Sequence, residues 1–233
     1  MFISKIENIL TQEKLARVQK IIETAKFVDG RISGGNERNK KNLEITPETE
    51  KYIEMVNIVE SAVRDNIEFN LTAFPRYMTR PIFSRYEVGM YYRSHVDNPV
   101  MGFMSRNYDL RPVGDNYVRS DLSMTLFLND PDSYDGGELT FEASVETVKV
   151  KLKGGSAILY PTGNRHSVAP VTHGARHAAI FWIQTMFPVE AHRQAVYDAR
   201  RLMNMIEKLA PDSELFNFAK GNFFNLGRIF AQI

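Results

Sequence analysis

The chain of 233 residues contains no cysteine. This absence excludes disulfide bonds, zinc sites built on thiolates and catalysis by a thiol nucleophile. The sequence also lacks an apolar run of the roughly 18 residues that a membrane-spanning helix requires. Charged residues interrupt the stretch 1–15, so we do not expect a signal peptide. Together these absences lead us to expect a soluble, cytoplasmic protein.

An excess of charge of one sign is also missing. Lys and Arg number 29 and Asp and Glu number 28, which gives a formal net charge of +1. A nucleic-acid-binding protein usually carries a strong basic excess, so we expect no nucleic-acid partner. The apolar content of 43% and charged content of 24% are typical of a globular protein long enough to bury one sizeable core.

Helical patterns lie towards both ends of the chain. Apolar residues recur at helical spacing in Thr11–Val28, in a second segment from Thr46-Pro47 to about Ile67, and again in 191–210 and 213–230. The polar, basic stretch 31–42 between the first two segments predicts a loop.

Between these helical regions the chain carries six short β-rich runs. They are 81–88, 122–129, 138–142, 147–152, 156–161 and 178–187. Turn-forming residues such as Asp135-Gly136-Gly137 and Gly154-Gly155 separate them. Many short strands without intervening helices indicate an antiparallel sandwich or barrel. We therefore predict an α+β fold, mainly β, with an N-terminal helical buttress (1–76), a β domain (77–187) and a C-terminal helical extension (188–233).

The run 121–129 (DLSMTLFLN) alternates between two kinds of residue, as a strand with two different faces does. The apolar set belongs in a core between sheets: Leu122, Met124, Leu126 and Leu128. The mixed set comprises Asp121, Ser123, Thr125 and Phe127. The mixed set could line a pocket for a small polar ligand or face solvent, and both interpretations stay open.

The residues His95, Asp97 and His166 form a candidate metal site. His95 and Asp97 lie at i and i+2 in YYRSHVDNP, so in an extended segment they point to the same face. His166 follows the apolar run SAILYP, which presents its ring at a strand end. Two imidazoles and one carboxylate leave positions open on an octahedral metal, an arrangement that suits non-haem Fe(II). Alone, the His-x-Asp pair is more typical of a surface loop than of a metal site.

Arg176 begins the apolar run that ends the β domain. Burying an arginine in such surroundings is expensive unless it pairs with an anion. Its guanidinium could bind a co-substrate carboxylate bidentately, or it could lie at the exposed start of the strand. Trp182, the only tryptophan, is six residues later and on the same face. It is expected to pack in the core or to form a pocket wall.

The stretches YEVGMYYRSHVDNP, RSDLSMTLFLNDPDSYDGGELTF and LYPTGNRHSVAPVTHGARHAAIFWIQT together resemble the 2-oxoglutarate/Fe(II) dioxygenases of the prolyl-hydroxylase superfamily. The similarity is strong over residues 77–187, and the bacterial PKHD-type hydroxylases resemble the chain most. The resemblance implies a double-stranded β-helix (jelly-roll) core flanked by N- and C-terminal helices. It also implies that His95, Asp97 and His166 bind iron, and that Arg176 pairs with the distal carboxylate of 2-oxoglutarate. Family members also use ascorbate.

The resemblance assigns further residues to the co-substrate pocket, namely Tyr92 beside the metal, Leu139 against the co-substrate and Trp182 in the pocket wall. At one position this chain departs from the family pattern. Where related prolyl hydroxylases carry a tyrosine whose hydroxyl supports the co-substrate carboxylate, this chain has Phe127. Tyr86 or Thr125 is our candidate for the missing hydroxyl, although Tyr86 lies one residue closer to His95 than the family spacing requires.

The activity that the resemblance implies is hydroxylation of a C–H bond, with O2 and 2-oxoglutarate consumed and succinate and CO2 released. The substrate would be a protein or peptide side chain, a prolyl residue included, or a free amino acid. A nucleic-acid demethylase of the same superfamily is disfavoured, because Trp182 stands where those enzymes carry a second arginine. The alternative is a non-catalytic, cupin-like jelly-roll module that binds a metal or ligand. The sequence leaves the oligomeric state open.

The remaining histidines and the C-terminal aromatics have simpler interpretations. His173, His177 and His192 are expected at the surface or in packing rather than as metal ligands. The C-terminal phenylalanines are expected to pack on the β domain or to form an oligomer interface. They are Phe216, Phe218, Phe223, Phe224 and Phe230.

Overall fold

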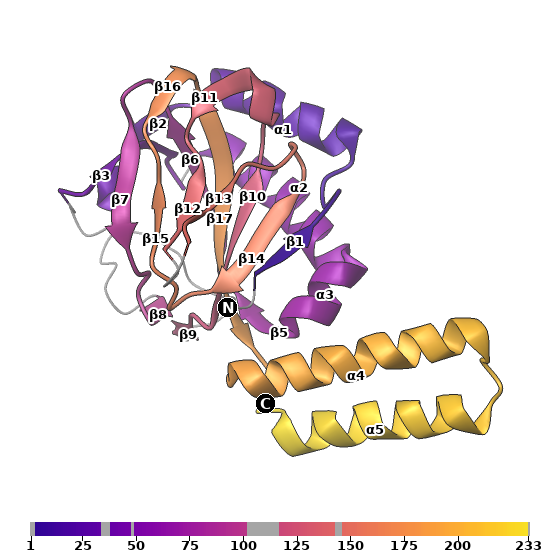
Figure 1. The fold of residues 1–233 in the computed structure, drawn as a ribbon. Coiled ribbons are helices and arrows are strands. Elements are labelled where there is room, and N and C mark those ends of the chain that lie inside the picture. Colours follow the sequence, from indigo (N-terminus) through magenta and orange to yellow (C-terminus); the bar gives the residue numbers. More distant parts are fainter. Residues whose placement is uncertain (1–2, 34–37, 48, 102–116, 143–145, 233) are drawn as a thin grey trace.

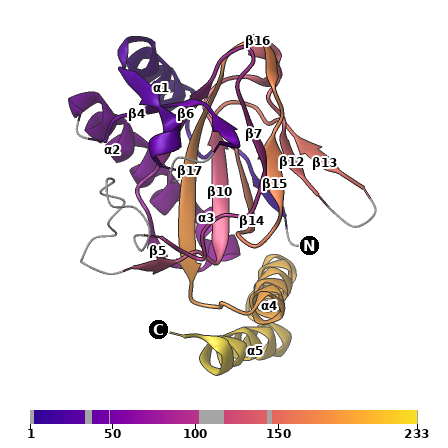
Figure 2. The ribbon, with the colours of Figure 1, turned by 90° about the vertical axis from the view of Figure 1, so that its left-hand side faces the viewer.

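The structure is a computed structural model that describes residues 3–33, 38–47, 49–101, 117–142 and 146–232. Two antiparallel sheets lie face to face, and α1, α2 and α3 cover the outer face of the larger one (Figures 1 and 2). Helices α4 and α5 form a hairpin that projects from this body (Figure 1). The α+β, mainly β class predicted from the sequence is confirmed.

The larger sheet has the strand order β1-β14-β10-β17-β6-β4-β2, with β5 also paired to β17. Its strands are β1 (Ser4–Ile6), β2 (Phe27–Asp29), β4 (Leu43–Ile45), β5 (Pro75–Met78), β6 (Ile82–Tyr86), β10 (Leu122–Phe127), β14 (Ala157–Pro161) and β17 (Arg176–Thr185). Strands β10 and β17 are central, which explains why both read as long apolar runs in the sequence.

The smaller sheet has the order β13-β12-β15-β7-β3. Its strands are β3 (Lys40–Lys41), β7 (Tyr91–His95), β12 (Leu139–Phe141), β13 (Val148–Val150) and β15 (His166–Val168). Two short ladders lie outside both sheets: β11 (Tyr134–Gly136) with β16 (Val171–Gly174), and β8 (Val100–Met101) with β9 (Val118–Arg119).

The α-helices are α1 (Gln12–Thr24), α2 (Glu50–Asp65), α3 (Ile67–Ala73), α4 (Glu190–Leu209) and α5 (Glu214–Phe230), with 3-10 turns at Gly30–Ile32 and Pro131–Ser133. Side-chain oxygens cap four of them at the N-terminus, where free backbone N–H groups need acceptors. The caps are Thr11, Thr49, Asn66 and Ser213. No helix in the described part of the chain is long and apolar enough to cross a membrane.

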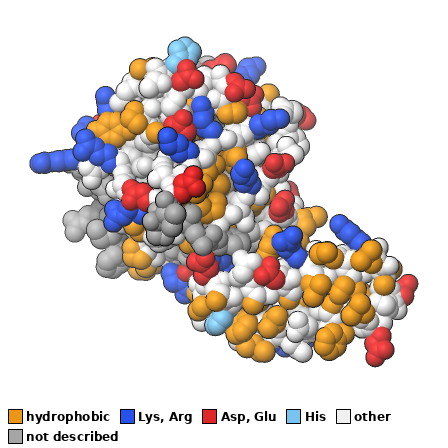
Figure 3. Space-filling model, viewed as in Figure 1, with side chains coloured by type: hydrophobic (Ala, Val, Ile, Leu, Met, Phe, Trp, Pro, Cys, Tyr) orange, Lys and Arg blue, Asp and Glu red, His pale blue; other side chains and the backbone are white. Residues whose placement is uncertain are grey.

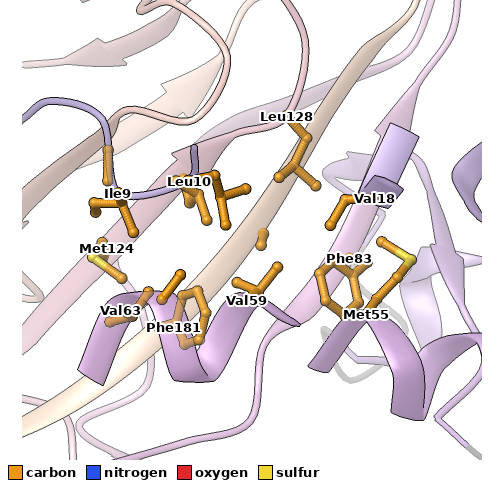
Figure 4. Close-up of a cluster of buried hydrophobic side chains, with 14 of the residues drawn as sticks. Ile9, Leu10, Val18, Met55, Val59, Val63, Phe83, Met124, Leu128 and Phe181 are labelled. Carbon is orange, nitrogen blue, oxygen red and sulfur yellow. The ribbon is translucent and has the colours of Figure 1, made fainter. Parts of the chain in front are cut away.

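The main hydrophobic core lies between the larger sheet and the helices (Figure 4). Val18 of α1 and Met55, Val59 and Val63 of α2 meet the apolar face of β10, represented by Met124. Full burial of each such side chain stabilises the fold by about 1.5–3 kcal/mol. The expectation that this face of β10 packs between two sheets is therefore wrong, because the helices cover it.

A second core fills the space between the two sheets. Its buried residues come from both, with Tyr86, Phe127, Ile158 and Tyr160 from the larger sheet and Leu139, Phe141, Val150 and Val168 from the smaller one. The mixed face of β10 points into this space, and Ser123, Thr125 and Phe127 are all buried. This burial excludes the solvent alternative for that face, whereas its role as a pocket lining stays a prediction.

The β-rich runs are confirmed as strands, whereas the N-terminal segments differ from expectation. The predicted helix Thr11–Val28 ends at Thr24, because residues 27–29 pair with β4 at the edge of the larger sheet. The second helix begins at Glu50 rather than at Pro47 and is capped by Thr49. Part of the predicted loop 31–42 is strand β3, which extends the smaller sheet next to β7.

The C-terminal hairpin is joined to the body by an aromatic cluster. Phe223 and Phe230 pack with Phe74, Phe187 and Val196, as expected for part of the phenylalanine set. Other apolar side chains of the hairpin are exposed. They are Leu202, Met205, Leu209, Leu215, Phe218, Phe224 and Ile229. Figure 3 shows that hydrophobic side chains are numerous on the face of the hairpin seen in that view. The oligomer interface suggested for this region stays a prediction.

Candidate metal centre and co-substrate pocket

The structure brings His95, Asp97 and His166 together at the smaller sheet. His95 is the last residue of β7 and His166 the first of β15, and the two are direct partners in the antiparallel ladder. Asp97 follows two residues after the end of β7. One potential ligand atom from each residue lies within 4.8 Å of the other two. Cross-strand pairing thus joins two parts of the chain that are 71 residues apart.

Backbone carbonyls orient both histidine rings. His95 Nδ1 lies 2.8 Å from the Arg93 carbonyl oxygen, and His166 Nδ1 lies 2.9 Å from the Asn164 carbonyl oxygen. Since a carbonyl only accepts, each Nδ1 carries the proton and each Nε2 keeps a free lone pair. Both Nε2 atoms face the Asp97 Oδ1 atom, at 3.5 and 3.8 Å. The three atoms are thus available to one metal ion.

The second oxygen of Asp97 is held by the protein. The Ser123 hydroxyl donates to Oδ2 at 2.8 Å and the Trp182 indole N–H donates to the same atom at 3.0 Å. Thr162 lies 3.0 Å from the Ser123 hydroxyl and completes this small network. Partners of this kind fix the direction of a ligand carboxylate and leave one oxygen, here Oδ1, for the metal.

The charge states of the site suit a cation. Burial alone would raise the pKa of Asp97, but its contacts with His95, His166 and Ser123 outweigh burial and hold the pKa below its ordinary value. Burial lowers the pKa of His166, with the Asp97 charge opposing. At neutral pH the site therefore offers a carboxylate and an unprotonated His166 imidazole, the forms that bind metals.

Aromatic rings enclose the metal-binding atoms. Tyr92 stacks on the His95 ring with centroids 3.6 Å apart and planes 16° apart. The Tyr160 hydroxyl lies 3.4 Å from His166 Nε2 on the other side. Side-chain exposures of 12% for His95, 11% for Asp97 and 5% for His166 leave a narrow approach to the site. Tyr92 was predicted beside the metal, whereas Tyr160 was not predicted.

Arg176, the first residue of β17, is 1% exposed and lies between the sheets. This excludes the alternative that it sits at an exposed strand start. Its guanidinium carbon lies 5.3 Å from the Tyr86 ring centroid and 5.4 Å from the Phe127 ring centroid. Among the described residues, Arg176 Nε has no hydrogen-bond partner and no carboxylate pairs with the guanidinium. A buried cation in such surroundings can accommodate an anion.

The other predicted pocket residues lie between the sheets as well. Tyr86 is the direct strand partner of Arg176, and burial raises the pKa of its hydroxyl. Thr125 is buried on β10 between Ser123 and Phe127, and Leu139 is buried on β12. Their burial between the sheets is shown, and their roles towards a co-substrate stay predictions.

Several groups near the site were not predicted from the sequence, namely Tyr134, Tyr160, Thr162 and the backbone carbonyls of Arg93 and Asn164. Tyr160 alternates with Leu159 in β14, and that alternation was the available signal for an inward-facing residue. A backbone carbonyl leaves no signature in the sequence.

The remaining histidines lie apart from the metal-binding group. His173 is exposed and the His192 ring stacks on Phe230 with centroids 4.0 Å apart. Burial, aided by the charges of Arg85 and Arg176, lowers the pKa of His177 to about 4. In the described part of the chain, His95, Asp97 and His166 form the one group of three or more potential metal ligands.

Comparison with known proteins agrees with this geometry. The sequence profile of the 2OG-Fe(II) oxygenase superfamily matches residues 81–184. A PKHD-type hydroxylase of Gluconacetobacter diazotrophicus is 38% identical over 90% of each chain. One from Cupriavidus metallidurans is 33% identical over 98% of this chain and 99% of that protein.

Solved structures show the same fold at low sequence identity. A Trichoplax adhaerens prolyl hydroxylase, in complex with a peptide fragment of hypoxia inducible factor, has a TM-score of 0.54 at 19% identity and covers 78% of this chain and 82% of its own. A Pseudomonas putida prolyl-4-hydroxylase has a TM-score of 0.51 at 18% identity, with coverages of 78% and 92%. The predicted jelly-roll core is confirmed.

Fold and profile define a 2OG-Fe(II) oxygenase. Within that superfamily, the chain belongs to the PKHD-type hydroxylases. It is therefore a member of a family of oxidoreductases. Membership of this family implies Fe(II) as the metal and 2-oxoglutarate and O2 as co-substrates. The donor set of two imidazole nitrogens and one carboxylate oxygen fits Fe(II).

Proposed function

We propose that the protein is an Fe(II)- and 2-oxoglutarate-dependent hydroxylase in which His95, Asp97 and His166 bind the iron and Arg176 binds the distal carboxylate of 2-oxoglutarate. The observation that carries this proposal is the pairing of two features inside one sandwich. One is a preoriented two-histidine, one-carboxylate set. The other is a buried arginine without an anionic partner among the described residues.

When bound, Fe(II) would supply the activation of O2 that converts 2-oxoglutarate to succinate and CO2 and hydroxylates a C–H bond of the substrate. The residues of this chain would bind and orient the participants. Ser123 and Trp182 hold Asp97 Oδ2, so that Oδ1 faces the two Nε2 atoms. The Tyr92 ring, stacked on His95, restricts the movement of that imidazole.

At the other end of the pocket, Arg176 would neutralise the co-substrate carboxylate. A guanidinium presents paired N–H donors that match both oxygens of a carboxylate. Phe127 and Tyr86 flank this guanidinium and exclude water, which strengthens a charge-assisted hydrogen bond. Leu139, buried on β12, would pack on the carbon chain between the two ends of the co-substrate.

The prime substrate in this proposal is a side chain of a protein or peptide, with prolyl residues as the first class to examine. The support is the set of prolyl hydroxylases among the structural neighbours, one of them in complex with a peptide. Ascorbate is proposed as the reductant that returns oxidised iron to Fe(II). Formation of succinate should rise when prolyl peptides are added. A rise with free amino acids alone would contradict the peptide class.

The proposal is tested by titrating Fe(II) and 2-oxoglutarate into the metal-free protein under anaerobic conditions. The chelate of Fe(II) with a 2-oxo acid has a weak visible charge-transfer band. We expect that band in the wild type, none in His166→Ala, and a need for far more 2-oxoglutarate in Arg176→Ala. Absence of the band in the wild type at saturating Fe(II) would overturn the proposal.

A further inference from the structure

At the Arg176 end of the pocket, two buried polar groups lack hydrogen-bond partners among the described residues. They are the Arg176 Nε–H group and the Tyr134 hydroxyl. Both residues are 1% exposed, so solvent does not serve them. A buried polar group without a partner is destabilising, and two neighbouring ones point to a missing ligand.

The ring of Tyr134 is held firmly beside Arg176. Tyr134 lies on the short strand β11, and Lys151 donates to its carbonyl oxygen at 2.6 Å. The same Lys151 Nζ lies 4.0 Å from the centroid of the Tyr134 ring. The ring is therefore fixed from one side by a cation, which leaves the hydroxyl as its free polar group.

Gly137 allows this close approach. Its backbone has φ +65°, and a Cβ added there would lie 3.1 Å from Tyr134 Cε2 and 3.2 Å from Arg176 Cδ. The edge of the tyrosine ring and the aliphatic part of Arg176 thus meet at the space that the glycine leaves open. Any side chain at position 137 would push these two residues apart.

The chemistry of the two groups specifies an acceptor. A guanidinium has five N–H donors and no acceptor. A phenol oxygen that accepts a hydrogen bond from the guanidinium can still donate its own O–H proton to another group. Burial raises the pKa of Tyr134, while the charge of Arg176 and a hydrogen-bonding contact of Arg176 with the hydroxyl oppose this shift, so the hydroxyl keeps its proton at neutral pH. A carboxylate has enough lone pairs to accept from both residues.

The other candidate hydroxyl donors, Tyr86 and Thr125, make different contacts. Tyr86 presents the face of its ring to the guanidinium, in a cation–π contact at 5.3 Å. Thr125 forms a hydrogen bond with Tyr160. Burial raises the pKa of Tyr160, and this hydrogen bond opposes that shift. Phe127, next to the guanidinium, has no hydroxyl. Tyr134 is the tyrosine whose buried hydroxyl remains unpartnered beside Arg176 in the described chain.

We propose that the Tyr134 hydroxyl binds the distal carboxylate of 2-oxoglutarate together with Arg176, and so supplies the hydrogen bond that Phe127 cannot. This inference rests on the proposed function and names a binding residue for it. It replaces our sequence-based candidates for that donor, Tyr86 and Thr125.

The test compares two ligands on the Fe(II)-loaded protein under anaerobic conditions, with the charge-transfer band as the readout of binding. One is 2-oxoglutarate, and the other is 2-oxobutyrate, which keeps the chelating 2-oxo acid but lacks the distal carboxylate. Removing one hydrogen bond to a carboxylate should raise the Kd of Tyr134→Phe for 2-oxoglutarate about tenfold. Its Kd for 2-oxobutyrate should stay within about twofold of the wild type.

Two further variants complete the test. Tyr52→Phe removes another buried phenol, whose hydroxyl donates to the Pro81 carbonyl in the helix-covered core, and should leave both dissociation constants unchanged. Tyr86→Phe examines the rival donor. Equal weakening of both ligands in Tyr134→Phe, no weakening at all, or a selective loss confined to Tyr86→Phe would each overturn the inference. A wild type without the band would instead overturn the proposed function.

Discussion

The candidate metal site (the metal end) and the surroundings of Arg176 (the Arg176 end) differ in how many of their polar atoms have hydrogen-bond partners. At the metal end, each atom that is not needed for a metal already has a protein partner: both Nδ1 atoms contact carbonyls, and Asp97 Oδ2 accepts two hydrogen bonds. At the Arg176 end, the guanidinium Nε and the Tyr134 hydroxyl have none among the described residues.

This difference matches the different requirements of a metal ion and of an anion. A metal needs lone pairs held at fixed positions, and hydrogen bonds on the far side of each ligand provide them without blocking the near side. An anion needs donors that nothing else occupies, and burying such donors destabilises the empty protein. The metal site is thus ordered in advance, whereas on the proposed function the surroundings of Arg176 would be completed by the co-substrate.

The largest expected effect is on metal binding. Asp97→Ala should weaken Fe(II) or Mn(II) binding more than about 100-fold, because loss of an outer-shell partner alone typically weakens it 10–100-fold. The matched control is Asp135→Ala, which removes an exposed carboxylate outside the site. Equal metal affinity in the two variants, measured by calorimetry, would show that Asp97 is not a ligand.

Arg176→Met should affect the binding of 2-oxoglutarate without affecting the binding of the metal. We expect the Kd for 2-oxoglutarate to rise about 100-fold or more, because a bidentate charged interaction is lost. Metal affinity should not change. Without 2-oxoglutarate the variant should be more stable, by about 1 kcal/mol or more, since an apolar side chain replaces an unpaired buried charge. A lower Tm for the ligand-free variant would contradict this account of the Arg176 end.

The predicted metal ligands and Arg176 were accessible to sequence reasoning because short local patterns mark each of them. His95 and Asp97 lie two residues apart on one extended segment, and His166 and Arg176 flank recognisable apolar strands. The hydrogen-bonded partners were not accessible. Ser123 and Trp182 reach Asp97 across 26 and 85 residues of sequence, and only the strand register brings them there.

The fold, too, could be predicted only in part from the sequence. The strand runs and the two faces of β10 follow from alternation, whereas the layer that covers each face does not. The apolar face was expected to meet a second sheet, yet α1 and α2 cover it, because an apolar surface fits either partner. Tyr134 lies outside both main sheets, on β11, and its approach to Arg176 depends on the backbone turn at Gly137.

Ser123→Ala should have an intermediate effect on the metal end. Loss of its hydrogen bond to Asp97 Oδ2 should weaken Fe(II) or Mn(II) binding about tenfold. The affinity for 2-oxoglutarate should fall only as far as metal occupancy falls. Ser167→Ala, outside this network on the same sheet as His166, is the control for a lost hydroxyl. Unchanged metal affinity in Ser123→Ala would show that the Asp97 partners do not order the site.

The smallest effect concerns His177, a partly buried residue that follows Arg176 in β17 and whose Nε2 lacks a partner among the described residues. Its pKa is about 4 in the folded protein, against the ordinary value of 6.5. Between these values the unfolded chain binds the proton and the folded one does not, so stability falls as pH decreases from about 6.5 towards 4. From pH 7 to pH 5.5 the loss should be about 1 kcal/mol.

Urea unfolding at these two pH values checks the expectation. His177→Gln should lose less stability on acidification than the wild type, while His173→Gln, which alters an exposed histidine, should behave like the wild type. An identical loss in all three proteins would show that His177 does not contribute to acid sensitivity.

The most direct test of the contrast between the two ends is a crystal structure with Mn(II) and 2-oxoglutarate bound. We predict the metal on Nε2 of His95 and His166 and on Oδ1 of Asp97, with the Ser123 and Trp182 contacts to Oδ2 unchanged. The distal carboxylate should lie against both Arg176 and the Tyr134 hydroxyl. A metal on Oδ2 or on either Nδ1, or a carboxylate bound away from Arg176, would contradict the account.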